Sequence, residues 1–499
     1  MLKQFLARKP IAEDSDRGLI RTLGAGDLVM MAIGAVIGAG IFSSLGTAAA
    51  GEIARDGTVI RAGAGPALIL SFVLLGAVCG LAALCYAELA SMIPQAGSAY
   101  AYTYATLGEL LAWIIGWDLI LEYAVGNIAV AVAWSGYFVS LLSGFGITFP
   151  AWLTHGYLQA TTSNDAAVHG LLESAPHFFG VPVILNMPAF AIVGLITWLL
   201  LRGARESARA NNIMVAIKLA VLTLFVIVGA QHINPANYVP FAPNGFRGIH
   251  QGAAIVFFAY IGFDAVSTAA EETKNPQRNL PIGILGGLAI CTLIYVVVGA
   301  VATGIVPYQQ LASADPLARA LELAGLHKTS WIVAAGAVVS LSAVLLVFQY
   351  GQPRIFFGMA KDGLMPRWAA KVHPKTRVPH ITTIITGIFV GLGALGAEEN
   401  MIYDLTNIGT LAAFALVCIG VLVLRVREPE RHRGFRVPFI WLVAPLGAAS
   451  CLFVMKGLPP TAWERFGIWL VIGIALYFGY GYTHSVLRTG REVVTDELV

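Results

Sequence analysis

The feature that most constrains this chain is the recurrence of apolar stretches long enough to cross a lipid bilayer. A helix that crosses the hydrocarbon core needs about 20 apolar residues. We find twelve such stretches, at residues 24–50, 66–93, 107–142, 181–201, 211–231, 251–270, 281–305, 331–357, 380–396, 403–424, 437–457 and 463–482. Only 12% of the residues are charged, whereas roughly a quarter are charged in soluble domains. The sequence therefore predicts an all-α integral membrane protein with twelve transmembrane helices.

The lysines and arginines predict the orientation, because short loops rich in these residues stay in the cytoplasm. If the N-terminus is cytoplasmic, 23 of the 31 cationic residues fall in cytoplasmic segments and 7 in external loops, and Lys218 lies inside a span. Both termini are thus predicted to be cytoplasmic. The net charge of +3 reflects this asymmetry, and we expect the basic loops to meet anionic lipid headgroups rather than nucleic acid.

Three glycines interrupt the first stretch, in the run GAVIGAG at residues 34–40. Glycine costs about 1 kcal/mol relative to alanine inside a helix, so the run requires an explanation. In one interpretation the helix unwinds here, and free N–H and C=O groups bind a carboxylate and an ammonium group. In the other, Gly34 and Gly38 allow close helix packing of the small-xxx-small type.

A second interruption, FFAYIGFD at residues 257–264, lies in the sixth stretch, five helices further along. Interruptions at corresponding positions of two repeats are typical of transporter binding sites, so the pair favours a binding site over packing. We predict an inverted repeat of five plus five helices, residues 24–231 and 251–425, with broken first and sixth helices. Two additional helices at 437–486 and cytoplasmic tails at 1–23 and 487–499 complete a single membrane transport domain, 1–499.

Lys218 lies in the middle of an apolar stretch, nine residues beyond Arg209 at the predicted cytoplasmic end. The simplest interpretation is that its long side chain reaches back to the membrane surface. Nine helical residues span about 13 Å, however, which is close to the bilayer centre. An ammonium group there loses hydration, so Lys218 is a candidate to exchange a proton between transport states.

Three of the carboxylates inside predicted spans are candidates for function. Asp264 follows the second interruption, where a charged group costs about 2.5 to 3.5 kcal/mol on insertion scales unless it faces a cavity or a partner. Asp118 and Glu122 are four residues apart and so share one helix face. We expect Glu122, the deeper of the two, to face the site, and Asp118 to bond neighbouring helices. A position for Asp264 near the hydrated interface remains the alternative.

The remaining polar residues give no sign of catalysis. The five cysteines lie inside apolar helices without metal-ligand spacing, and we predict reduced thiols. The ten histidines fall in loops or at span ends, and neither a catalytic triad nor a phosphate-binding loop is present in the sequence. We therefore predict neither an enzyme nor a bound cofactor or metal.

Four motifs, taken together, resemble bacterial members of the amino acid–polyamine–organocation superfamily. They read GAVIGAGIF at 34–42, PQAGSAY at 94–100, GFDAVST at 262–268 and NPQRNLP at 275–281. The similarity runs from about residue 23 to residue 424 and points to the cationic amino acid transporter-like branch. It implies alternating access and proton-driven uptake of amino acids.

The resemblance also implies roles for single residues. Backbone amides of Ala39 and Gly40 would hold the substrate carboxylate. Phe258 would be an aromatic gate that closes over the substrate. The backbone around the substrate ammonium would come from Val36, Phe258, Ala259 and Ile261, and Ile37 would also be among the substrate-binding residues. The coupling groups would be Lys218, Glu122 and Asp264, with Lys218 in place of a sodium ion and Glu122 also near the substrate.

Two positions bear on specificity. Relatives often carry Thr or Ser where this chain has Ala39, so the carboxylate would be held by backbone alone. Phe348, in FQYGQ at 348–352, would by resemblance line the side-chain pocket, where its bulk would exclude lysine or arginine. Small neutral L-amino acids are therefore the expected substrates.

The resulting hypothesis is an amino-acid and proton symporter in the bacterial inner membrane, in contact with lipids. An exchanger of amino acids or polyamines is the alternative within transport. A sensor that binds amino acids without moving them is a third hypothesis, which the titratable residues in the spans disfavour. An accessory membrane subunit is neither predicted nor excluded.

Overall fold

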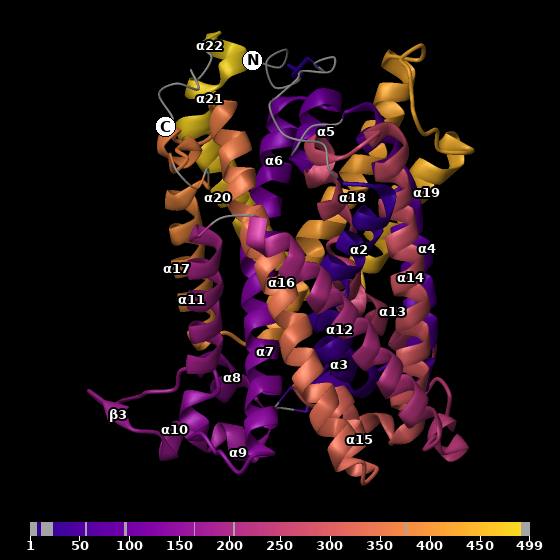
Figure 1. The fold of residues 1–499 in the computed structure, drawn as a ribbon, viewed down its shortest axis with the longest axis vertical. Coiled ribbons are helices and arrows are strands. Elements are labelled where there is room, and N and C mark those ends of the chain that lie inside the picture. The colour runs from indigo at the N-terminus through magenta and orange to yellow at the C-terminus, as the bar shows by residue number, and fades with distance from the viewer. Residues whose placement is uncertain are drawn as a thin grey trace.

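The computed structural model describes residues 7–10, 23–54, 57–93, 97–163, 165–202, 205–374, 376 and 378–490. Most of the predicted tails and residues 94–96 of the PQAGSAY motif lie outside this set. Within it the chain is almost entirely helical, and the long helices run side by side in one bundle (Figure 1).

Among the described residues, eight helical segments are apolar and long enough to cross a membrane, and a bent pair makes a ninth. The bent pair is α2 (Ala25–Val36) followed by η1 (Gly40–Ser44) and α3 (Leu45–Ala50), with a 44° change of direction. The eight are η2–α4 (Gly65–Ala67, Leu68–Met92), α6–η3–α7 (Glu109–Ile120, Leu121–Val125, Gly126–Ser143), α12 (Arg205–Ala230), α13–η6–η7 (Gly245–Val256, Phe257–Tyr260, Phe263–Glu272), α14 (Pro276–Ile305), α16 (His327–Lys361), α18 (Glu399–Arg427) and α20–η10–α21–α22 (Pro460–Leu476, Tyr477–Gly481, Tyr482–His484, Val486–Thr489).

Three shorter apolar helices coincide with the other predicted spans, namely α11 (Met187–Leu201), α17 (His380–Gly396) and α19 (Ile440–Met455). Several predicted starts differ from the observed ones, most of all those of the fourth, fifth and sixth spans, by six residues each. The fourth span begins at Met187 rather than residue 181, because residues 181–182 pair with His177–Phe178 in a small hairpin. The sixth begins at Gly245 rather than residue 251, since the helix extends past the apolar stretch.

The smaller elements gather at the two ends of the bundle. Figure 1 shows α8 (Tyr157–Thr162), α9 (Ala166–His169), α10 (Leu171–Ser174), β3 (His177–Phe178) and α15 (Pro316–Leu323) at one end, and α5 (Ser98–Thr106) and α22 at the other. The first end is the predicted external side. The remaining elements are β1 (Gly51–Ile53), β2 (Val59–Ala62), η4 (Ala151–Leu153), β4 (Val181–Pro182), η5 (Pro235–Tyr238), η8 (Tyr308–Leu311) and η9 (Arg367–Ala370).

The broken helices lie inside the bundle. Helix α14 packs against both α2 and α4, and α16 packs against α7 and α12. In the most apolar 18 residues of the sixth span, 94% of the residues are buried inside the protein. In the corresponding part of the last span, 22% are buried. The last span therefore turns most of its apolar surface outward, as expected of a helix that faces lipid, while the sixth is placed to line an internal site.

Candidate substrate site

The first helix is interrupted where the glycine run predicts it. Helix α2 ends at Val36, and Ile37 is extended with ψ of 98°. The chain resumes a helical path at Ala39 and Gly40. The first amides of a helix have no acceptor within that helix, so those of Ala39 and Gly40 lie at a helix start, where an anion is favoured.

Lys218 binds the carbonyl groups that this interruption leaves free. Its Nζ donates hydrogen bonds to the carbonyl oxygens of Gly34 and Ile37, each at 2.8 Å. The residue is 0% exposed, so the side chain does not reach back to the membrane surface. Helix α12 is thus tied through one ammonium group to the break in the first helix.

The sixth helix is interrupted at Ile261 and Gly262. Ile261 is extended, and Gly262 has φ of +112°, a conformation that side chains disfavour. A Cβ on Gly262 would also lie 3.0 Å from Cβ of Ala35. Glycine is therefore needed here both for the turn and for close approach to the first helix.

The two interruptions touch each other. A Cβ on Gly40 would lie 2.2 Å from Cα of Ala259, closer than real Cβ contacts allow. Tyr295, on α14, has its hydroxyl 2.8 Å from the carbonyl oxygens of both Val36 and Ala259. Because one hydroxyl carries one proton, it can donate to only one of these oxygens at a time. Sequence reasoning missed Tyr295, since nothing distinguishes it from other aromatics in an apolar helix.

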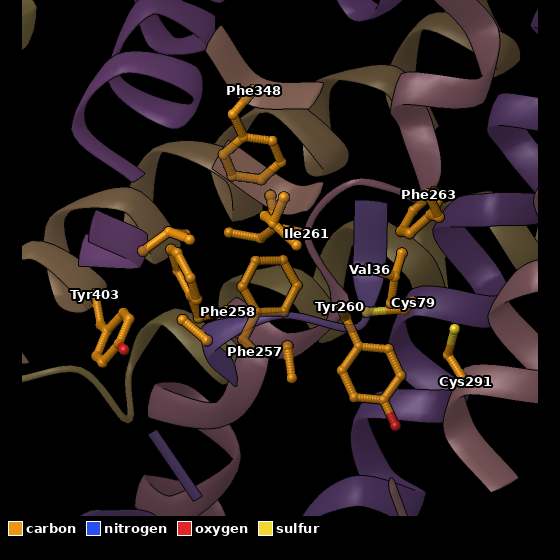
Figure 2. Packing of buried hydrophobic residues seen from close by; sticks show 14 of the residues in the cluster. Val36, Cys79, Phe257, Phe258, Tyr260, Ile261, Phe263, Cys291, Phe348 and Tyr403 are labelled. Atoms are coloured by element: carbon orange, nitrogen blue, oxygen red, sulfur yellow. The ribbon is translucent and has the colours of Figure 1, made fainter. Parts of the chain in front are cut away.

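An apolar cluster adjoins the breaks. Figure 2 shows the side chains of Phe258 and Ile261, from the break in the sixth span, close to the side chain of Phe348 from α16. A Cβ on Gly126 would lie 3.5 Å from the ring of Phe348 and 3.6 Å from that of Phe258. All three converging side chains are at most 4% exposed. The structure thus brings the predicted gate and the predicted pocket residue to the same place and closes that place from solvent.

Two of the predicted carboxylates are buried, with one oxygen bonded and one free of any partner among the described residues. Asp264 accepts a hydrogen bond of 3.0 Å from Ser98 on α5, and Glu122 accepts one of 3.0 Å from Thr410 on α18. Their other oxygens, Oδ1 and Oε1, are buried without a partner in the described part. Asp264 is 0% exposed, so it does not lie in a hydrated interface.

Asp118 does not bond neighbouring helices as expected. Both of its carboxylate oxygens are buried without a hydrogen-bond partner among the described residues. Its helix face is shared with Glu122, as the spacing of four predicts. Asn127 is within 3.5 Å of Gln349, a long contact that joins α7 to α16.

A polar network closes the predicted external side of the site. Arg61, in β2, donates to both carboxylate oxygens of Asp404 at 3.1 and 2.7 Å and to Glu52 at 2.8 Å. Glu399, at the start of α18, accepts hydrogen bonds from Ser43 and Tyr403.

The ring of Tyr403 lies 4.6 Å from that of Phe258, between centroids. The network therefore extends from the ion pair to the predicted gate. The sequence gives no sign of this network, because its partners come from distant parts of the chain.

Comparison with known proteins decides the family. A sequence model of the family described as "Amino acid permease" matches residues 23–477. The chain belongs to the amino acid permease family. The resemblance to amino acid–polyamine–organocation transporters and their cationic amino acid branch is therefore confirmed.

Several relatives cover most of the chain. The methylthioribose transporter of Bacillus subtilis is 44% identical over 98% of this chain and 100% of its own length. The branched-chain amino acid permease BcaP of the same organism is 45% identical over 96% of both chains. The vacuolar cationic amino acid transporter 4 of Arabidopsis thaliana is 36% identical over 84% of this chain and 66% of its own.

This permease is thus a multi-pass membrane protein of a transporter family rather than an enzyme. The names of its relatives span three substrate classes, so family membership alone does not choose among them. The choice depends on the residues that surround the two helix breaks.

Proposed function

We propose that this permease imports small neutral L-amino acids together with protons, by alternating access. The observation that carries the proposal is the contact of the buried Lys218 with the broken first helix, at Gly34 and Ile37. A titratable amine that holds the freed carbonyls can respond to protonation by loosening or tightening that helix.

The substrate backbone would lie between the two breaks. The amides of Ala39 and Gly40, at a helix start, suit a carboxylate. The substrate ammonium would be held by the backbone around Val36, Ile37, Phe258, Ala259 and Ile261. Tyr295 supports this assignment, since its hydroxyl keeps two of these carbonyls close together and leaves each with a second lone pair.

The whole architecture would be two inverted repeats of five helices, followed by two additional helices, in a bacterial inner membrane with cytoplasmic termini. The contact between the breaks of the first and sixth helices supports the repeat, because inverted repeats bring corresponding broken helices together at one site. Proton transfer would involve Glu122 and Asp264 as well as Lys218. Their unpartnered buried oxygens are suited to accept a proton.

The preference for small neutral side chains rests on Phe348, Phe258 and Ile261. These side chains fill the space beside the breaks (Figure 2), and none of them carries a charge that could neutralise a charged substrate side chain. The names of the two Bacillus subtilis relatives, a branched-chain amino acid permease and a methylthioribose transporter, also point toward uncharged substrates.

The central experiment tests coupling in proteoliposomes with Lys218→Met. A gradient of one pH unit can support about tenfold accumulation of alanine per proton. We expect the variant to lose this accumulation and to equilibrate alanine at most. Lys328→Met, an exposed lysine at the predicted external end of α16, is the control and should accumulate alanine normally. Full accumulation by Lys218→Met would refute the coupling role.

Substrate class is tested separately by thermal unfolding of the purified protein with each of the twenty amino acids and with methylthioribose. Alanine and similar neutral amino acids should raise the melting temperature most. Preferential stabilisation by arginine and lysine would contradict the role of Phe348. Counterflow without net proton-driven uptake would instead favour an exchanger.

A further inference from the structure

A cavity of about 550 Å³ lies at the predicted cytoplasmic end of the bundle, away from the substrate site. One wall is the loop after α16, with Gly363, Met365, Arg367 and Trp368, and the other is the end of the last span, with Tyr480, Thr483, His484 and Thr489. Volumes of a few hundred Å³ suit a small-molecule headgroup. None of these residues contributes to the substrate site.

We propose that this cavity binds the phosphate headgroup of an anionic phospholipid. Arg367 supplies the recognition, because a guanidinium group matches phosphate oxygens with two parallel donors. Arg367 is exposed and forms no ion pair with another described residue. The guanidinium is therefore available to a ligand.

The charge around the cavity favours an anion. Lys361 precedes the loop and Lys371 lies within it, and Arg488 precedes Thr489 on the other wall. Asp362 is the acidic residue of the described loop 362–374, and it is already paired with Lys9 at 2.7 Å and bonded by Tyr100 at 2.8 Å. Among the described residues of the two walls and their immediate flanks, Arg367 and these three cations outnumber the carboxylates of Asp362 and Glu109, so the net charge is positive.

The walls are held in place by the fold rather than by a ligand. A Cβ on Gly363 would lie 2.2 Å from the carbonyl oxygen of His484, and the amide of Val486 donates to the carbonyl oxygen of Asp362 at 3.0 Å. Glu109 also anchors the second wall, since Tyr477 and Ser485 both donate to its carboxylate. A preformed cavity loses little entropy when it binds a headgroup.

The position of the cavity selects a lipid rather than a soluble phosphate or an acidic protein segment. Trp368 is 45% exposed, and tryptophan and tyrosine gather at the level of lipid headgroups. Below the cavity, Leu476 and Phe478 on the last span are 46% and 47% exposed, so acyl chains would find an apolar surface there. A basic cavity at the cytoplasmic surface beside such a helix is typical of a headgroup site.

The test is native mass spectrometry of the full-length protein in detergent, titrated with phosphatidylglycerol or with phosphatidylethanolamine. We expect phosphatidylglycerol to bind more tightly, and Arg367→Gln to weaken its binding about fivefold, as expected for one lost cation near a phosphate. Thr483→Phe, which would fill the cavity, should weaken it similarly. The matched control is Arg319→Gln on α15, an exposed arginine at the opposite end, and it should bind lipid like the unmodified protein.

Equal binding of the two lipids, or an unchanged affinity for phosphatidylglycerol in both cavity variants, would overturn the proposal. A competition arm distinguishes the phosphate source. Displacement of phosphatidylglycerol by millimolar glycerol 3-phosphate would assign the cavity to a soluble phosphate and overturn the lipid assignment. Retention of the lipid under those conditions would support it.

Discussion

At the scale of single residues, Gly40 is where one added methyl group should be most damaging. The first and sixth helices meet there, and a Cβ would lie 2.2 Å from Cα of Ala259, which is backbone and cannot rotate away. Overpacking of this kind typically costs about 1 to 3 kcal/mol. We expect Gly40→Ala to separate the two breaks and abolish alanine uptake in proteoliposomes.

A second glycine of the same helix provides the control. A Cβ on Gly26 meets nothing within 4 Å, and alanine is favoured over glycine inside a helix by about 1 kcal/mol. Gly26→Ala should therefore transport normally. Normal uptake by Gly40→Ala would show that the close approach of the two breaks is not required for transport.

At the scale of elements, the carboxylate of Glu88 joins three helices through hydrogen bonds at the predicted cytoplasmic side. It lies near the end of α4 and accepts hydrogen bonds from Arg425 at the end of α18, from Arg433, and from the amide of Val437 before α19. Glu88 is 1% exposed. Such a carboxylate compensates two cations that the surrounding protein partly removes from water.

Glu88→Gln keeps the size of the side chain and removes its charge, so both guanidinium groups lose their ionic partner. Breaking a buried ion pair from one side costs about 3 to 5 kcal/mol, and we expect a loss of this size in the free energy of unfolding, measured in mixed micelles with SDS. Glu428→Gln is the control, since Glu428 pairs with Arg431 three residues away in a partly exposed position. That pair should contribute less than about 0.5 kcal/mol. Equal losses in the two variants would contradict the fastening role of Glu88.

At the scale of the whole molecule, the structure is closed on the predicted external side. Arg61, which is 2% exposed, joins the hairpin after the first span to Asp404 on α18. Next to this ion pair, Ser43 and Tyr403 bond Glu399, and Tyr403 contacts Phe258. In the alternating access proposed above, external opening would separate these partners.

Arg61→Gln should shift the population toward the externally open state, because removal of the ion pair destabilises the closed state only. Loss of even 1.4 kcal/mol changes such an equilibrium about tenfold. The measurement is the rate at which an external, membrane-impermeant thiol reagent modifies Ala39→Cys, since the five native cysteines are buried. The rate should rise about tenfold with Arg61→Gln and stay unchanged with Arg319→Gln. An unchanged rate in the Arg61 variant would exclude the ion pair as part of the closure.

The sequence by itself determined which segments form apolar helices of membrane-spanning character and where two of them break. The bilayer imposes this, because each crossing needs a continuous apolar helix and a glycine run inside one requires a compensating role. The sequence also placed Lys218 near the bilayer centre, too deep for its charged group to reach the membrane surface easily. The sequence-based prediction was wrong at helix starts. The hairpin at residues 177–182 and the extension of the sixth span to Gly245 depend on local folding, which the length of an apolar stretch does not reveal.

Only the tertiary structure decided which polar groups meet. Nothing in the sequence connects Asp404 with Arg61, which lies 343 positions away, yet the two form an ion pair. The sequence gives no indication that Tyr295 has a special role, whereas in the structure its hydroxyl lies between two carbonyl groups. The reason is physical. Helices buried on several sides have apolar residues all round, so their sequence does not reveal which face each one turns inward, and the rotation that brings partners together is set by packing against the neighbouring helices.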